Sequence, residues 1–334
     1  MKYNVGIIGC GLIGNKRAET LTAESRLMKV ADTNLEVAKN LAVKYECTYS
    51  LNWKDVTRDK NINIVIIATP NNLHSEIAID SLRNGKHVLI EKPAGRNPDE
   101  VKRIIEVYEG LGKKQRIKVG FNHRFHPAFD KARELIAKEK IGDIMYIRAR
   151  YGHGGRPDYD REWRADRNIS GGGEMLDQGL HIIDLSRYFM GDFNHVIGHC
   201  GTFFWDMDVE DNCFAIMKTV DGRAAHLHAS CTQWKNMFSF EIFCKTGLII
   251  IDGLGRSYGK ETLTFYKMKP EMGPPDKTVF EWDNSDMSWE REYRDFISSI
   301  KKNREPNGSI YDAYESIKLV YKIYASSDSG AKWS

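Results

Sequence analysis

The sequence has no long hydrophobic run and no strong excess of one charge. No apolar stretch approaches the ~18 residues that a membrane-spanning helix needs, and the apolar run from Val5 is short and broken by glycines, so we also expect no secretory leader. Lys and Arg number 49 against 46 Asp and Glu. This balance argues against a nucleic acid or an anionic membrane as partner. We expect a cytoplasmic globular protein.

Cysteine is also sparse, and no two cysteines form a C-x-x-C pair. This spacing predicts neither a zinc site nor a disulfide framework, which suits a reducing cytosol. We find no internal repeat and no low-complexity segment. The six cysteines are Cys10, Cys47, Cys200, Cys213, Cys231 and Cys244.

The 334 residues are enough for about two domains. The first ~120 residues alternate strand and helix, which predicts a doubly wound parallel sheet of the α/β class. The later strands follow one another at hairpin spacing, with a two-residue turn at Asp221-Gly222, and predict an α+β domain with a mainly antiparallel sheet. We therefore expect domains at 1–122 and 123–334, with a loop over 270–276 and helices over 174–190, 289–301 and 311–326.

A glycine-rich turn near the N-terminus organises the first domain. Residues 5–8 form a short β-branched strand that runs into G-x-G-x-x-G, and a helix-compatible segment follows. Gly9 permits the tight turn, Gly11 lets the backbone approach a pyrophosphate, and Gly14 lets the helix pack close to the strand. The helix N-terminus offers free N–H groups to the phosphates.

An acid ends the second expected strand, at Asp32. Its carboxylate can accept hydrogen bonds from ribose hydroxyls, and its charge would repel a 2′-phosphate. Thr33 and Asn34 follow, with no Arg, so we favour NAD(H) over NADP(H). The alternative is a plain strand–turn–helix unit that binds no nucleotide.

Three polar segments follow other expected strands, at residues 69–74, 91–93 and 122–124. Ligands of doubly wound sheets bind beyond the carboxyl ends of the strands. The order of the chain therefore predicts that these segments line one crevice.

Lys92 is the first candidate for chemistry. A Lys beside a nicotinamide can hydrogen-bond a substrate hydroxyl and favour its alkoxide-like state. Pro93 fixes its own φ, and a cis bond before it would aim the Lys into the crevice. The alternative is a surface Lys at a strand end.

The second candidate is the helix over 174–190. Asp177, His181 and Asp184, spaced i, i+4 and i+7, share one face, and apolar residues cover most of the remainder. His181 is suited to act as a general base near neutral pH, with Asp177 orienting it. The alternative is a solvated polar face.

Three further motifs allow two interpretations each. His226 and His228 point from one sheet face and could be metal ligands, although spacing indicates no third ligand. His74 is either a helix-start residue or a cofactor contact. Trp163, beside Arg164, is either a core residue or a stacking wall.

In combination these motifs resemble the glucose–fructose oxidoreductase, inositol dehydrogenase and MocA family. The resemblance runs from residue 3 into the last helix. It implies a Rossmann domain followed by an α/β domain whose open-faced antiparallel sheet forms a dimer or tetramer interface. The motifs are Gly6 to Gly14, Ala68-Thr69-Pro70-Asn71 with His74, Glu91-Lys92-Pro93, Asn122-His123-Arg124-Phe125, and Gly171-Gly172-Gly173 followed by Leu176 to Leu185.

The resemblance also implies roles for individual residues. Catalysis maps onto Lys92, Asp177 and His181, and substrate binding onto these three with Arg124, Tyr151 and His153. We expect no metal. The expected NAD-binding residues are Gly9, Gly11, Leu12, Ile13, Gly14, Asp32, Thr33, Thr69, Pro70, Asn71, His74, Glu91, Lys92, Asn122, Trp163 and Arg164.

These assignments predict an NAD(H)-dependent oxidoreductase acting on a carbinol of a sugar, polyol or nucleotide sugar, with a small molecule as its partner. A non-catalytic NAD(H)-binding sensor is the alternative from another class, but it has no need of Lys92, Asp177 and His181 together. A rival enzyme is an NAD-dependent glycosidase, in which transient oxidation labilises the glycosidic bond. Net NADH formation distinguishes a dehydrogenase from a glycosidase.

Overall fold

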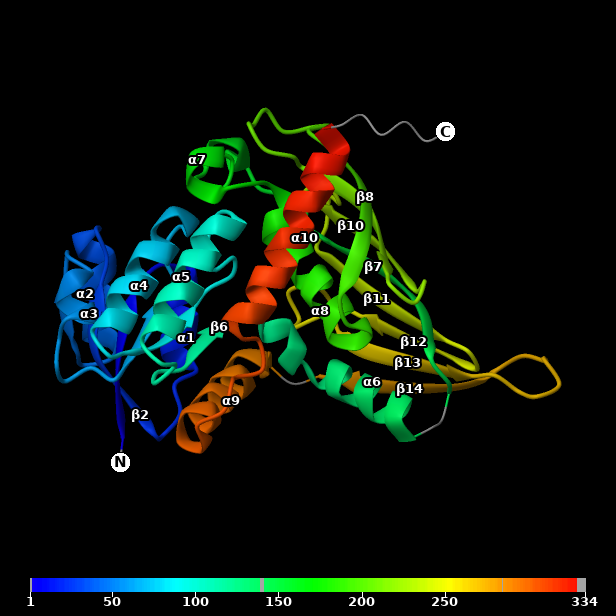
Figure 1. Ribbon diagram of the computed structural model, residues 1–334, viewed down its shortest axis with the longest axis horizontal. Helices are drawn as coiled ribbons and strands as arrows, with labels where there is room; N and C mark the ends of the chain where they lie inside the picture. The colour runs from blue at the N-terminus through cyan, green and yellow to red at the C-terminus, as the bar shows by residue number, and fades with distance from the viewer. Residues whose placement is uncertain (1, 139–140, 284, 329–334) are drawn as a thin grey trace. The chain divides into compact units, whose positions relative to one another are not determined.

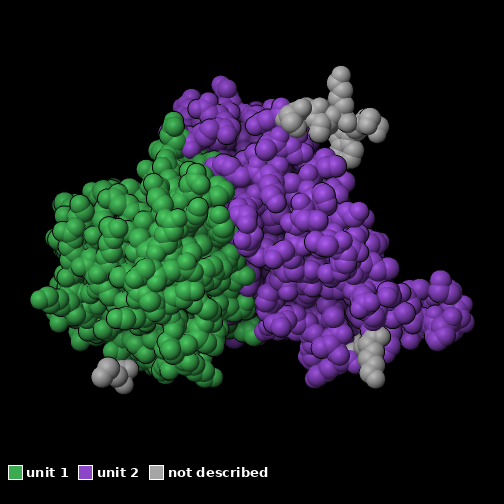
Figure 2. All heavy atoms as spheres, viewed as in Figure 1, with its two compact units in different colours: residues 1–121, 168–171, 289–314 green, residues 122–167, 172–288, 315–334 purple. Residues whose placement is uncertain are grey.

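The computed structural model describes residues 2–138, 141–283 and 285–328. The chain divides into two compact units (Figure 2). The first unit comprises residues 1–121, 168–171 and 289–314, and the second comprises residues 122–167, 172–288 and 315–334. The alternation of strands and helices predicts a boundary between residues 122 and 123, and it gives no indication that residues 168–171 and 289–314 group with the first unit.

The first unit is built on a six-stranded parallel sheet in the order β3-β2-β1-β4-β5-β6 (Figure 1). This order confirms the predicted Rossmann architecture. The strands are β1 (Tyr3–Ile8), β2 (Ser25–Ala31), β3 (Thr48–Ser50), β4 (Ile64–Ile67), β5 (His87–Ile90) and β6 (Ile117–Val119). The helices are α1 (Leu12–Glu19), α2 (Leu35–Lys44), α3 (Lys54–Thr57), α4 (His74–Arg83), α5 (Pro98–Gly110), α7 (Arg167–Ser170) and α9 (Ser288–Lys302), with the 3₁₀ turn η1 (Asn71–Leu73).

Helix α9 completes the core of the first unit from far along the chain. Tyr293, Phe296 and Ile297 pack in one buried cluster with Val5 of β1 and Ile64 of β4. The helix is strongly amphipathic in sequence, which explains why it must cover an apolar surface.

A buried ion-pair network also ties α9 to this unit. Arg17, which is 1% exposed, binds Glu91 at 2.5 Å and Glu292 of α9 at 2.6 Å. Its guanidinium also lies over the ring of Trp289. A buried charge of this kind is stable only when it is paired, and here two carboxylates share one Arg.

The second unit is built on an eight-stranded sheet in the order β14-β13-β12-β11-β7-β10-β9-β8 (Figure 1). All neighbours are antiparallel except β7 and β10, so the prediction of a mainly antiparallel sheet is confirmed. The strands are β7 (Ile144–Gly152), β8 (Phe193–Gly201), β9 (Asn212–Thr219), β10 (Ala224–Ser230), β11 (Met237–Cys244), β12 (Gly247–Asp252), β13 (Glu261–Lys267) and β14 (Asp276–Trp282). The helical elements are α6 (Pro127–Lys138), α8 (Leu180–Met190), the 3₁₀ turns η2 (Asn122–Phe125) and η3 (Tyr159–Arg161), and the π-helical turn η4 (Met175–Gly179); α10 (Ile310–Asp328) begins in the first unit and continues in the second.

Alternation along the strands gives this sheet one buried face and one exposed face. In β9, Cys213, Ala215 and Met217 are buried, whereas Phe214 and Ile216 are 38% and 40% exposed. Helix α8 packs against β7 and β10, and α6 packs against β13. The predicted turn at Asp221-Gly222 joins β9 to β10, and Gly222 adopts φ +90°, which favours glycine.

Two features of the second unit differ from the sequence-based expectation. Strand β14 follows the loop expected over 270–276, and the sequence does not predict it. An edge strand exposed on both faces shows no apolar alternation by which it could be recognised. A disulfide joins Cys200 to Cys213, contrary to the expectation of no disulfide framework. These cysteines are direct partners in the pairing of β8 with β9, and their spacing of 13 residues does not reveal that register.

The helix expected over 174–190 is also not uniform. It starts with the π-helical turn η4 and becomes α-helical at Leu180. A Cβ on Gly179 would lie 2.4 Å from Met175 Sδ and 3.2 Å from the Cβ of Ala229 in β10, so a larger residue there would require the Met175 side chain to move. Across the helices that the structure describes, none is both long and apolar enough to cross a membrane.

Candidate active site

The glycine-rich turn has the geometry that its sequence predicts. Gly9 adopts φ +90°, and a Cβ there would lie 2.3 Å from the carbonyl oxygen of Ala68. A Cβ on Gly14 would lie 1.9 Å from the carbonyl oxygen of Gly9. Gly11, by contrast, faces open space and caps α1 without any side-chain hydrogen bond. The backbone N–H groups at the start of α1 are therefore available to a phosphate.

Asp32 lies at the end of β2 and is bound to the glycine-rich turn. Its Oδ2 accepts a hydrogen bond from the Cys10 N–H at 2.8 Å, and its Oδ1 accepts one from the Asn34 N–H at 2.9 Å. Each carboxylate oxygen retains lone pairs that can accept a ribose hydroxyl. The carboxylate is thus fixed in place, while Leu12 and Thr33 nearby in the sequence are exposed and Ile13 is half-buried.

The segment after β4 holds several of the predicted cofactor residues. Pro70 precedes η1, and the side-chain amide of Asn71 donates to the Ser170 carbonyl at 2.8 Å. Thr69 Oγ1 is buried, and within the described residues it has no hydrogen-bond partner. A buried hydroxyl of this kind needs a partner, and a bound ligand can supply one.

His74 contacts the segments that follow strands β4 and β5. It is 1% exposed, begins α4, and places its ring nitrogens 2.7 Å from the Pro93 carbonyl and 2.8 Å from the Thr69 carbonyl. Burial lowers the pKa of His74, although both carbonyls oppose that effect. These contacts favour the helix-start interpretation over direct contact with a cofactor.

Lys92 comes one residue after Glu91, whose carboxylate forms a buried ion pair with Arg17. Lys92 itself is half-buried, and its bond to Pro93 is cis. The segment that carries Lys92 is therefore held by His74 on one side and by Arg17 on the other.

Asn122 and Arg124 lie in the second unit, in the turn η2. Asn122 donates to Ser288 Oγ at 3.0 Å. Arg124 forms two hydrogen bonds with Asp184, from Nε at 2.7 Å and from Nη2 at 2.6 Å, and both side chains are buried. A buried bidentate pair is a structural contact, so Asp184 faces Arg124 rather than extending a polar stripe.

His181 lies in an aromatic setting that the sequence did not reveal. It is 5% exposed, and its ring stacks on His123 with centroids 3.8 Å apart and planes 19° apart. Tyr151 lies edge-on to His181 with ring centroids 6.1 Å apart, and it is tilted against His123 with centroids 5.1 Å apart. Burial raises the pKa of Tyr151 well above its usual value, so this phenol stays neutral.

Asp177 lies in the π-helical turn and is more exposed than His181. Arg164 Nε lies 3.4 Å from Asp177 Oδ2, and the Arg164 guanidinium also lies over the ring of Trp163 at 4.5 Å. A π-helical turn within a helix often occurs at functional sites. The second unit thus brings together Tyr151, His181, Asp177 and Arg164 of the predicted residues.

Three side chains around this group, those of His123, Tyr159 and Glu174, are not among the predicted site residues. His123 lies in the Asn122–Phe125 motif, which assigns no role to it. Tyr159 donates to Glu174 Oε1 at 2.8 Å, and His153 Nε2 lies 3.6 Å from the same oxygen. The position of Glu174, directly after three glycines and three residues before Asp177, was the available signal.

His226 and His228, the two candidate metal ligands, lie on strand β10. His228 Nε2 lies 3.0 Å from Asn212 Oδ1, and its ring stacks on Phe214 at 4.1 Å. Burial lowers the pKa of His228 to about 4. Over the described part of the chain, no group of three or more His, Cys, Asp or Glu residues is arranged to hold a metal ion.

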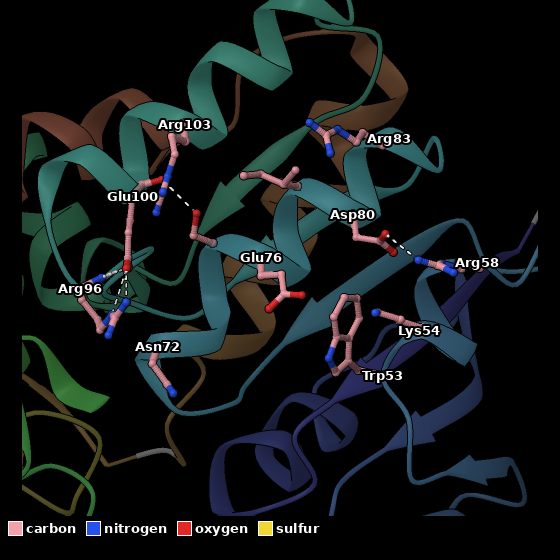
Figure 3. A pocket seen from close by; sticks show the side chains of 12 residues that line it. Trp53, Lys54, Arg58, Asn72, Glu76, Asp80, Arg83, Arg96, Glu100 and Arg103 are labelled. Atoms are coloured by element: carbon pink, nitrogen blue, oxygen red, sulfur yellow. Dashed lines mark hydrogen bonds and ion pairs between the residues drawn. The ribbon is translucent and has the colours of Figure 1, made fainter. Parts of the chain in front are cut away.

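A surface groove of about 460 Å³ lies elsewhere on the first unit, along α4 (Figure 3). Its charged walls are partly paired, with Arg58 3.4 Å from Asp80 and Arg96 2.5 Å from Glu100. None of the predicted site residues lines it. The groove is therefore distinct from the glycine-rich turn.

Comparisons with known proteins agree with this geometry. Residues 3–121 match the model of an oxidoreductase family with an NAD-binding Rossmann fold, and residues 129–250 match that of the GFO/IDH/MocA C-terminal domain. Levoglucosan dehydrogenase of Pseudarthrobacter phenanthrenivorans is 31% identical over 66% of this chain and 59% of its own length. Inositol 2-dehydrogenase of Rhizobium meliloti is 26% identical over 67% of this chain and 68% of its own length. The chain thus spans less than two thirds of the first of these relatives.

Solved structures extend the likeness to the whole fold. A levoglucosan dehydrogenase in complex with NADH superposes with a TM-score of 0.88 and 24% identity, and the match covers 98% of both chains. The chain belongs to the GFO/IDH/MocA family, and residues 3–121 are its NAD-binding Rossmann domain.

Proposed function

We propose that this protein is an NAD(H)-dependent dehydrogenase acting on a carbinol carbon of a sugar, polyol or nucleotide sugar. The observation that carries the proposal is the setting of His181, a buried imidazole stacked on His123 one turn from the half-exposed Asp177. Relatives named as levoglucosan and inositol dehydrogenases support the substrate class.

The fit of the cofactor rests on the first unit. The open side of Gly11, the start of α1 and the carboxylate of Asp32 suit the pyrophosphate and the adenosine ribose of a dinucleotide. The Thr69 hydroxyl offers a further polar contact. Asp32 would disfavour a 2′-phosphate, and we therefore propose NAD(H) rather than NADP(H) as the working cofactor.

In the oxidative direction, NAD held by the glycine-rich turn and Asp32 would supply the acceptor for the hydride of the carbinol carbon. Lys92 donates a hydrogen bond to the carbinol oxygen and stabilises negative charge as it develops there. His181 accepts the hydroxyl proton as a general base. Asp177 stabilises the imidazolium that results, and Arg164 holds the Asp177 carboxylate.

A screen of sugars, polyols and UDP- or GDP-sugars with NAD tests this function. We expect NADH to accumulate with at least one compound class, measured by its absorbance. Free sugar released without net NADH would instead indicate a glycosidase. Tight NAD binding without turnover of any compound would indicate a sensor and contradict the proposal.

We also propose that the exposed face of the second unit's sheet joins copies of this chain. Ile197, Phe214 and Ile216 lie side by side on β8 and β9, each 38–45% exposed. An apolar row of this kind on a sheet face is typical of an interface. Light scattering should report a dimer or tetramer, and Ile216→Lys should shift it toward monomer, whereas Lys138→Ala, at an exposed position of helix α6 rather than on this sheet face, should not. A monomeric wild type would refute this assignment.

A further inference from the structure

Glu174 is a buried carboxyl that the proposed chemistry does not use. It is 2% exposed and lies directly before the π-helical turn that carries Asp177. Its Oε1 accepts the hydrogen bond from Tyr159, its Oε2 is buried and accepts no hydrogen bond from an N–H or O–H group of the described residues, and the Cys231 thiol, a weak donor, lies beside the carboxyl group. Such an oxygen is costly as part of a carboxylate but less so when it carries a proton.

The contacts of Oε1 indicate which oxygen holds the proton. His153 Nδ1 accepts the Gly155 N–H at 3.0 Å, so the neutral ring carries its hydrogen on Nε2, 3.6 Å from Glu174 Oε1. Tyr159 donates to the same oxygen. Oε1 is therefore the carbonyl-type acceptor, and Oε2 is the place for a proton.

The charges around Glu174 also favour its neutral form. Burial and the negative charge of Asp177 raise the pKa of Glu174 to about 8, against the lowering effect of the Tyr159 hydroxyl. Glu210 is a second buried carboxyl, and the Glu174 N–H donates to its backbone carbonyl. The titratable and charged groups facing Glu174 are Asp177 of η4, Tyr151 of β7, Tyr159 of η3, His153 and Arg164 of the connecting loop, Glu210 before β9, Cys231 after β10 and Tyr258 after β12.

Burial raises the pKa of Glu210 as well, but each of its oxygens accepts a hydrogen bond from an N–H or O–H group, so neither matches Oε2 of Glu174. The oxygens of Glu210 accept hydrogen bonds from the N–H groups of Gly173 and Met175 and from the Tyr324 hydroxyl. Glu210 holds the start of η4 in place. Glu174 is thus the buried carboxyl beside Asp177 that has an oxygen without an N–H or O–H donor.

We propose that Glu174 is a positioning residue of the dehydrogenase proposed above: by holding a proton on Oε2 at neutral pH, it leaves Asp177 as the negative charge that His181 experiences. This inference rests on the proposed function for its meaning in catalysis. Tyr151 lies edge-on to His181 and experiences the charge of both Asp177 and Glu174, so the three groups share one environment.

The sign of the effect follows from charge. As pH rises through the neutral-to-alkaline range, Glu174 ionises and adds a second negative charge that favours the protonated imidazole. Below that range Glu174 is neutral, and His181 titrates against the charge of Asp177 alone. Glu174→Gln keeps the size of the side chain and remains neutral at every pH, so it should leave the His181 titration near neutral pH unchanged and abolish the further change in the alkaline range.

The test needs no substrate and uses the NAD-saturated full chain. Infrared difference spectra should show a protonated carboxyl band in wild type at pH 7 that disappears on raising the pH and is absent in Glu174→Gln. In NMR titrations, the wild-type His181 ring signals should show a second inflection at the pH where this band disappears, and Glu174→Gln should lack it. Glu241→Gln, which removes another buried carboxyl of the second unit, paired with Arg148 at 2.5 Å, should change neither readout.

Three outcomes would overturn the inference: no protonated carboxyl in wild type at pH 7, a band that survives in Glu174→Gln, or a wild-type His181 titration without the second, alkaline inflection. If Glu174→Gln does not fold, Glu174→Asp takes its place and should retain a titrating band at a changed pH. A missing band there would equally refute the inference. Failure of the proposed function appears separately, as absence of NADH formation with intact spectra.

Discussion

Replacing Asp32 is the most direct test of how the first unit selects its cofactor. Two unit charges about 4 Å apart interact by about 4 kcal/mol at an effective dielectric constant of about 20. Asp32 is only half-buried, so solvent reduces its repulsion of a 2′-phosphate. We therefore expect NAD(H) to bind at least ~10-fold more tightly than NADP(H), a difference of about 1.4 kcal/mol.

The choice of variant follows from the two hydrogen bonds that Asp32 accepts. In Asp32→Asn, the new NH₂ group would face the N–H of either Cys10 or Asn34, so a donor would meet a donor. Asp32→Ala avoids this conflict, although it leaves both N–H groups without the carboxylate. It should weaken NAD binding and narrow the ratio between the two cofactors.

The assay is a calorimetric titration of both cofactors at one fixed ionic strength. Asp99→Ala is the matched control, because Asp99 is an exposed acid in the first turn of α5 in the same unit. It should leave the ratio unchanged. Equal affinities in wild type, or an unaltered ratio in Asp32→Ala, would show that this carboxylate does not select the cofactor.

Three further predictions follow: two concern the proposed chemistry, and one concerns the stability of the second unit. Lys92→Ala and His181→Ala should leave NAD binding and melting temperature nearly unchanged while turnover falls, by ~10²–10⁴ for His181; near wild-type kcat in either variant would remove that residue from the mechanism. Asp177→Asn removes a negative charge beside His181, so the rising limb of the pH profile of kcat/KM for oxidation should move to lower pH and turnover should slow; an unshifted limb would leave Asp177 a binding or structural role. Asp184→Ala strands the buried Arg124 charge and should destabilise the second unit by about 3–5 kcal/mol in urea unfolding, whereas Arg124→Met with Asp184→Leu should recover much of the loss.

The first unit is the part of the fold that sequence reasoning predicts best, because its signals are local. The strand before Gly9, the glycines themselves and Asp32 lie within 30 residues, and each has a steric or polar reason to be where it is. Local patterns of this kind carry their own physical explanation.

The features that were missed depend on partners distant in sequence. Nothing near residue 293 indicates that Tyr293 packs against β1, and the register that joins Cys200 to Cys213 exists only once β8 and β9 pair. The i, i+4, i+7 spacing places Asp184 on one face with His181 only in a uniform α-helix. In the structure, Asp184 forms an ion pair with the buried Arg124. Stacking of His123 on His181 likewise brings together two residues from separate elements.

The return of α9 to the first unit has a consequence for synthesis on the ribosome. Strands β1 to β6 emerge first, yet Arg17 and the apolar cluster around Val5 and Ile64 reach their final partners only when Glu292, Tyr293 and Phe296 have been translated. The nucleotide-binding domain therefore completes after most of the second unit has left the exit tunnel. A nascent chain stalled before residue 289 would lack the Glu292 carboxylate for Arg17 and the side chains of Tyr293 and Phe296 for the apolar cluster.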